Sequence, residues 1–156
     1  MQMKKGMMVV LVGLVMFLGV SFSFAAGDAG TKDEAVAMVQ KAIEFYKANG
    51  QEKAFAEFSN PKGQFKDRDL YIVVYNMDGK CLAHGSKKSM IGKELIDFKD
   101  VDGTPYMKER IDMMKKQKSG WQNYKFMNPV TKKIQPKEMY VQREGDLIFG
   151  CGVYKK

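Results

Sequence analysis

The feature that most constrains the fold is a pair of strand-forming runs separated by Asp78-Gly79. Residues 70–77 read LYIVVYNM and residues 80–86 read KCLAHGS. The first run is rich in β-branched and aromatic residues, which favour strands. An Asp-Gly pair between two such runs is the strongest short-range signal for a hairpin. The sequence therefore predicts two antiparallel strands in the middle of the chain.

Three further strand-forming runs lie near the C-terminus and are separated by turn residues. They are Trp121–Met127, Lys137–Arg143 and Leu147–Tyr154, with Asn128-Pro129 and Glu144-Gly145-Asp146 between them. Because the connections are short, neighbouring runs are expected to pair in antiparallel fashion. The sheet should therefore have five strands.

Three segments have the apolar spacing of helices: residues 33–48, residues 51–58 and a segment from about Pro105 to Lys116. Thr31 or Asp33 can cap the first of them, and Asn49-Gly50 can end it. The order of helices and strands predicts an α+β domain in which the long N-terminal helix covers part of the sheet. The central helix either covers the other side or closes over a cavity.

The first 26 residues have the layout of a secretory signal peptide. Lys4 and Lys5 precede an apolar run, and Ser23-Phe24-Ala25 forms a small-x-small cleavage site. An uncleaved membrane anchor is the alternative, since about 18 apolar residues are enough to span a bilayer. We expect cleavage after Ala25 or Ala26, one mature domain at residues 27–156, and a periplasmic or secreted protein.

The charge of the mature chain bears on the kind of partner. Removing Lys4 and Lys5 from the 26 basic residues leaves 24 against 18 acidic ones, a net charge of +6. In a cytosolic protein this excess would suggest nucleic acid. Export removes that expectation, and the lysines are scattered among acidic residues. The charge therefore predicts a solvated surface with a modest bias toward anionic ligands.

The run GWQNYKFMNP at residues 120–129 mixes aromatic and polar residues on both of its faces. In the strand it forms, Trp121 points to one side and Tyr124 to the other. In the run from Lys137, the side chain of Lys137 likewise opposes that of Tyr140. Alternation alone therefore leaves open which set faces a cavity.

Several motifs together are similar to those of extracellular single Cache domains of the second type, which have a PAS-like fold. The matching features are an LAH triplet after a DG hairpin, a GW-x-x-Y strand, a PK-x-x-YV strand and a terminal G-x-GVY. They lie within three stretches: NPKGQFKDRDLYIVVYNMDGKCLAHGS, IGKELIDFKDVDGTPYMKE and GWQNYKFMNPVTKKIQPKEMYVQREGDLIFGCGVYK. Together the stretches cover most of residues 60–155.

The resemblance implies a fold and a function. The fold is a five-stranded antiparallel sheet in the order 2-1-5-4-3, counting the expected strands along the chain. The function is binding of a small metabolite such as acetate, propionate, pyruvate or lactate, without catalysis. Because no second span or signalling module follows Tyr154, we expect a separate membrane-bound receptor or kinase as partner. A protein-interaction module with an empty pocket is the alternative. The N-terminal helix would allow a homodimer.

In the family the ligand lies between the sheet and the loop and helix ahead of the third strand. A carboxylate there needs convergent hydrogen-bond donors in a site that excludes water. An apolar wall could come from Phe126, Met127 or Phe149. Each candidate has an alternative reading as a core or edge residue. The predicted ligand-binding residues are His84, Tyr106, Trp121, Tyr124, Phe126, Lys137 and Tyr140.

The two cysteines are expected to be unpaired. In the implied strand order Cys81 and Cys151 lie about two strand spacings apart, roughly 9–10 Å, too far for a disulfide.

His84 and the two cysteines lack zinc spacing, and the acidic turn at residues 97–102 lacks EF-hand spacing, so no metal or cofactor is expected. Cys81 and His84, three residues apart on one strand, should face opposite sides, which disfavours a catalytic pair.

Overall fold

Two helices form the N-terminal part of the structure. The computed structural model describes residues 29–155, and the predicted signal peptide lies outside them. α1 (Lys32–Asn49) begins with a capping box between Thr31 and Glu34, and Gly50 ends it at a positive φ of 79°. α2 (Gln51–Phe58) follows directly. Both helices predicted from the apolar spacing are confirmed.

The main sheet has the predicted five antiparallel strands. Their order is β4-β3-β7-β6-β5, which is the order 2-1-5-4-3 implied by the family resemblance. The strands of the sheet are β3 (Val73–Asn76), β4 (Cys81–His84), β5 (Ser119–Met127), β6 (Ile134–Glu144) and β7 (Leu147–Tyr154).

The first predicted strand, residues 70–77, is divided in two. β2 (Leu70–Tyr71) pairs with β1 (Lys66–Asp67) in a separate hairpin, and only Val73–Asn76 joins the main sheet. The backbone N–H of Ile72 still bonds to the carbonyl of Phe65, so the strand leaves the small hairpin only after this point. The hairpin turn contains Arg68 at a positive φ of 54°, a conformation that sequence patterns do not indicate for arginine.

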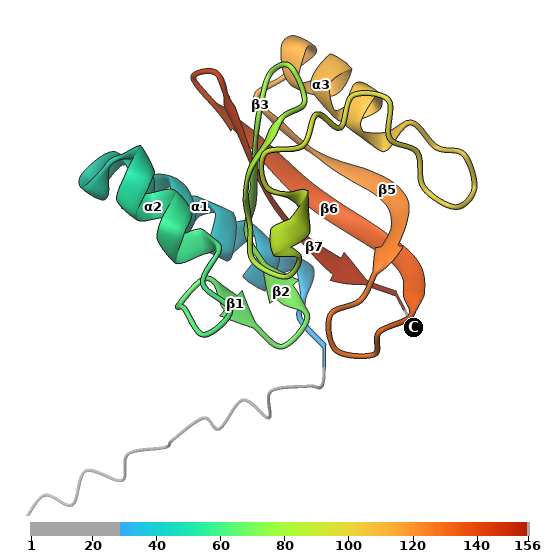
Figure 1. Ribbon diagram of the computed structural model, residues 1–156, viewed down its shortest axis with the longest axis horizontal. Helices are drawn as coiled ribbons and strands as arrows, with labels where there is room; N and C mark the ends of the chain where they lie inside the picture. The colour runs from blue at the N-terminus through green and yellow to red at the C-terminus, as the bar shows by residue number, and fades with distance from the viewer. Residues whose placement is uncertain (1–28, 156) are drawn as a thin grey trace, which may run out of the picture.

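The sheet is covered on both faces, so the domain has three layers (Figure 1). α1 and α2 pack on the face that we call the α1 face, with Val39, Ile43, Phe58 and Phe149 in the core between them. η1 (Lys88–Met90), the following loop and α3 (Tyr106–Lys116) cover the opposite face, which we call the α3 face. Along the middle strands, alternate side chains therefore enter different cores.

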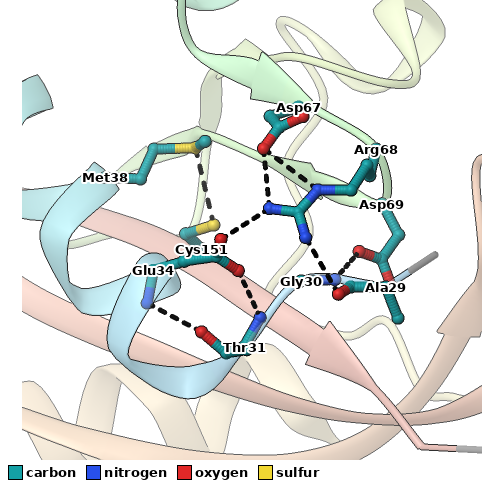
Figure 2. Close-up of polar contacts among 9 residues, drawn as sticks. All are labelled: Ala29, Gly30, Thr31, Glu34, Met38, Asp67, Arg68, Asp69 and Cys151. Atoms are coloured by element: carbon teal, nitrogen blue, oxygen red, sulfur yellow. Dashed lines mark hydrogen bonds and ion pairs between the residues drawn. The ribbon is translucent and has the colours of Figure 1, made fainter. Parts of the chain in front are cut away.

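The segment before α1 is fastened to the β1–β2 hairpin (Figure 2). Arg68 donates to the carbonyl of Ala29 at 3.0 Å and forms an ion pair with Glu34 at 2.8 Å. The backbone N–H of Gly30 donates to the buried carboxylate of Asp69 at 2.7 Å. The N-terminal segment is thus fixed to the hairpin that also carries Tyr71, a residue of the candidate site.

Both cysteines are free, as predicted, and both are buried. Cys81 belongs to the core of the α3 face and Cys151 to that of the α1 face, so the sheet itself separates them. The prediction relied on the strand spacing alone. The two side chains also point to opposite faces of the sheet, which keeps the thiols further apart.

The expectation that Cys81 and His84 face opposite sides is wrong. Val74 pairs with Ala83 and Tyr75 with Cys81, so Leu82 is the extra residue of a β-bulge. The bulge shifts the alternation by one position and turns Cys81 and His84 to the same face. Burial raises the pKa of the Cys81 thiol to about 12, so the thiol stays protonated and is a poor nucleophile.

Within residues 29–155 no helix combines the length and apolar character that crossing a membrane requires.

Candidate functional site

The structure brings some of the predicted ligand-binding residues together and separates others. Trp121 and Tyr140 lie on the α1 face, where their rings contact each other at 5.4 Å and Lys32 covers the indole at 4.9 Å. Phe149, an expected wall residue, lies in the core of that face too. The remaining predicted residues lie on the α3 face: His84, Tyr106, Tyr124, Phe126 and Lys137.

Lys137 is the central charged group of the α3 face. Its side chain is 1% exposed, and it donates to the hydroxyl of Tyr71 at 2.8 Å. The ammonium nitrogen also lies 4.2 Å from the ring centre of Tyr71, 4.8 Å from that of Tyr154 and 5.7 Å from that of Phe126. Among the described residues no carboxylate lies within ion-pair distance of it. Burial lowers the pKa of Lys137 to about 7.

The hydrogen bonds around Lys137 leave part of its donor capacity unused. Tyr154 donates to the carbonyl of Met127 at 2.8 Å, because a carbonyl only accepts. The hydroxyls of Tyr71 and Tyr154 are 3.0 Å apart, so Tyr71 donates its proton to Tyr154 and accepts from Lys137. Both phenol protons are committed. An ammonium has three donors, and in the described residues only one of those of Lys137 has an acceptor.

His84 presents a neutral N–H donor beside the same rings. Its Nδ1 accepts the backbone N–H groups of Ser86 at 3.3 Å and Lys87 at 3.0 Å, which places the ring proton on Nε2. Burial, followed by the positive charge of Lys137, lowers the pKa of His84 to about 3. The imidazole stacks on Tyr71 at 5.3 Å and lies 6.1 Å from Phe126. It is therefore a hydrogen-bond donor that carries no charge at neutral pH.

Arg110 is a second buried cation on the α3 face that the sequence analysis did not find. It is 0% exposed, and its Nε donates to the side-chain oxygen of Gln122 at 3.0 Å. Its two terminal nitrogens have no hydrogen-bond partner among the described residues. The guanidinium instead lies 5.2–5.6 Å from the ring centres of Tyr75, Tyr106 and Tyr124.

Contacts between aromatic rings link the residues around Arg110 to those around Lys137. Tyr106 stacks on Tyr124 at 4.8 Å, and Tyr124 contacts Phe126 at 6.0 Å. The Tyr124 hydroxyl, which interacts with the guanidinium of Arg110, donates its proton only to the sulfur of Met139, over a long contact of 3.8 Å. Its proton is therefore held by a weak acceptor and is available to a better one.

A hollow of about 200 Å³ opens onto these rings. Its lining includes Tyr106, whose ring lies near the guanidinium of Arg110, and Phe126, whose ring lies near the ammonium of Lys137. The loop that bounds it is held by Asp100, whose carboxylate accepts the backbone N–H groups of Asp102, Thr104 and Lys125. The lining residues are Lys87, Met90, Phe98, Lys99, Asp100, Val101, Tyr106, Lys125, Phe126, Met127 and Ile134.

Gly152 makes room for Lys137. A Cβ at this position would lie 2.6 Å from Cε of Lys137, 2.8 Å from the carbonyl oxygen of Glu138 and 3.0 Å from Cα of Met139. The last two atoms belong to the backbone of a paired strand and cannot move aside. The G-x-GVY motif thus includes a glycine that the buried lysine requires.

We expect Gly152→Ala to lower the free energy of unfolding by roughly 1–3 kcal/mol, the usual cost of overpacking a core. Gly150→Ala is the matched control, because it lies on the same face of β7 and its Cβ would meet only side-chain atoms, at 3.0–3.2 Å. Urea denaturation of both variants measures the difference. A larger loss for Gly150→Ala would contradict this account of Gly152.

The residues that sequence reasoning missed had different kinds of signal. Arg110 stands in the apolar stripe of the central helix, between Met107 and Met114, and a cation at such a position is a usable sign of a buried site. Tyr71 and Tyr154 had none, because their contact joins residues 83 positions apart.

The fold and the arrangement on its α3 face are those of a PAS-like sensory domain, in which one face of a five-stranded antiparallel sheet carries a polar site under a helix and loop. The chain belongs to the family described as Single Cache domain 2, whose model matches residues 25–156. Domains of this family are extracellular or periplasmic sensory modules and are non-catalytic.

Solved structures of similar fold support this assignment. A methyl-accepting chemotaxis protein from Vibrio parahaemolyticus RIMD 2210633 is 27% identical, with a TM-score of 0.66 over 79% of this chain and 87% of that chain. A structure described as "Structural basis for carboxylic acid recognition by a Cache chemosensory domain" is 22% identical, with a TM-score of 0.68 over 80% and 92% of the two chains. A periplasmic sensor domain of a chemotaxis protein is 16% identical, with a TM-score of 0.63 over 80% and 90%. No curated protein matches the chain.

Proposed function

We propose that the domain is a periplasmic sensor that binds a small organic acid on the α3 face, with Lys137 as the group that holds the carboxylate. The observation that carries the proposal is the buried ammonium of Lys137, which has no acidic partner and has unused donors. A buried charge is costly unless a partner of opposite charge accompanies it. A bound carboxylate would supply that partner.

Other groups on the α3 face fit the same ligand. His84 offers a neutral Nε2–H, which adds a hydrogen bond without adding charge. Arg110 offers two terminal nitrogens without a hydrogen-bond partner among the described residues, which would bind a second oxygen of the ligand, such as the oxo or hydroxyl oxygen of pyruvate or lactate. Phe126 supplies an apolar wall next to Lys137. Acetate, propionate, pyruvate and lactate are therefore the first candidates.

The similar structure described in terms of carboxylic acid recognition supports the choice of ligand class. The chemotaxis proteins among the similar structures support a sensory role in which ligand binding is passed to a membrane-bound signalling partner. The signal peptide and a homodimer through α1 remain predictions, as does the exclusion of nucleic acid.

Isothermal titration calorimetry with the four acids tests the proposal. We expect at least one acid to bind, its neutral amide to bind far more weakly, and Lys137→Met to abolish binding. Lys108→Met is the matched control, since Lys108 is exposed on α3 and should leave the affinity unchanged. Equal binding of acid and amide, or full affinity in Lys137→Met, would rule out Lys137 as the carboxylate site.

A further inference from the structure

We propose that the acid recognised by this domain carries an apolar tail of several carbons, which lies in the hollow above Tyr106 and Phe126. This inference rests on the proposed function, because it takes the carboxylate to be held at Lys137. It adds the class of ligand: an amphipathic monocarboxylic acid, such as a medium-chain acid, in preference to acids of two or three carbons.

Exposed apolar side chains gather at the hollow. Phe98, Val101, Met127 and Ile134 all line it, and their exposed fractions range from 41% to 61%. They come from the loop before α3 and from the adjoining ends of β5 and β6. Single exposed apolar residues are common, but a contiguous group around a concave surface is typical of a binding site.

Phe126 is the residue that the hollow shares with the proposed carboxylate site, because Lys137, His84 and Arg110 do not line the hollow. Phe126 lines the hollow and also lies 5.7 Å from the ammonium of Lys137 and 6.1 Å from the ring of His84. The ring of Tyr106, which also lines the hollow, lies 5.6 Å from the guanidinium of Arg110. A ligand whose carboxylate reaches Lys137 past Phe126 therefore has its tail in the apolar hollow.

The charge around the opening suits an acid rather than a neutral apolar molecule. Lys87 and Lys99 lie at the rim, and neither makes an ion pair with another described residue. Lys125 pairs with Asp102 at 2.8 Å and is neutralised there. Asp100 adds one negative charge to the lining, so a net positive charge remains, and it favours the approach of an anion.

The size of the hollow limits the tail. At roughly 30 Å³ per non-hydrogen atom, the approximate volume of a water molecule in the liquid, a space of about 200 Å³ holds about seven atoms. Burial of each methylene group should raise the affinity about fourfold. Because the carboxylate lies at Lys137 outside the hollow, about seven tail atoms correspond to octanoate, and we expect the affinity to rise from acetate to octanoate and to level off for longer acids.

Titration calorimetry with acetate, butyrate, hexanoate, octanoate and decanoate, each below its micelle concentration, tests the inference. The expected result is a rise of about fourfold per methylene up to octanoate, with hexan-1-ol binding far more weakly than hexanoate. In Ile134→Ser and Phe98→Ser the ratio of hexanoate to acetate affinity should fall. Val130→Ser is the matched control, because Val130 is an exposed apolar residue outside the hollow and should leave the ratio unchanged.

The outcomes separate this inference from the proposed function. If acids bind but the affinity is flat or falls with chain length, the tail site is wrong and the acid sensor stands. The same conclusion follows if the variants at Ile134 and Phe98 keep the full chain-length effect. If no acid binds, or if hexan-1-ol binds as tightly as hexanoate, the carboxylate site fails and the inference falls with it.

Discussion

Replacing Lys137 with methionine should give a protein that is more stable without ligand and no longer binds acids. The pKa of Lys137 falls from the usual 10.5 to about 7 because the charged form is buried. By linkage this drop corresponds to roughly 5 kcal/mol of stability that the protein loses at pH values below 7, where the buried lysine is charged. Methionine has a similar shape, carries no charge and packs well against aromatic rings.

The sign of the pH dependence follows from proton binding. Between pH 7 and pH 10.5 the unfolded chain holds a proton on Lys137 that the folded protein has released. Stability therefore rises with pH in this window, and the full loss is present below it. From pH 6 to pH 9 the wild-type protein should gain roughly 2–3 kcal/mol relative to Lys137→Met.

Urea denaturation of both proteins at pH 6 and pH 9 measures this difference, because groups that titrate in both proteins cancel. Lys108→Met should behave like the wild-type protein, since its lysine is exposed. A lower stability of Lys137→Met at pH 6 would show that the lysine is structural. If the stability difference between the wild-type protein and Lys137→Met is the same at pH 6 and pH 9, the charge of Lys137 is compensated by another group.

Local sequence signals were enough to predict most elements of the fold. The Asp78-Gly79 hairpin, the cap at Thr31 and the stop at Gly50 each depend on residues a few positions apart, and each occurs as expected. The division of the first strand was missed because it depends on Arg68, which adopts a positive φ while its side chain binds Ala29 and Glu34. Those contacts join residues more than 30 positions apart.

The candidate site was harder to predict than the fold. It depends on which face of the sheet each side chain lies on, and on which helix covers that face. Alternation correctly placed Lys137 and Tyr140 on opposite faces of the sheet, but both faces of β5 and β6 carry polar and aromatic residues. On the α1 face these residues have partners from α1, as in the ion pair of Lys32 with Glu138. On the α3 face Lys137 and Arg110 have no acidic partner among the described residues. The lack of an acidic partner for these buried cations, which only a structure reveals, distinguishes the two faces.

The affinity for an organic acid should fall steeply as the pH rises above 7. A carboxylate binds to the charged form of Lys137, and in the free protein this form is lost above a pKa of about 7. Binding must then take up a proton, and the affinity should decrease about tenfold per pH unit. Between pH 6 and pH 9 the expected loss is about a hundredfold, which is larger than any effect expected from surface charges.

No other group near Lys137 should titrate in this range. The pKa of His84 is lowered to about 3 by burial, and burial raises the pKa values of Tyr71 and Tyr154, so these groups stay neutral. Arg110 stays charged throughout. Calorimetry at pH 8.5 in two buffers of different ionisation enthalpy should therefore report uptake of close to one proton per acid bound. A constant affinity from pH 6 to pH 9 would mean that Lys137 is charged before the ligand arrives, and that a partner other than the acid holds its proton.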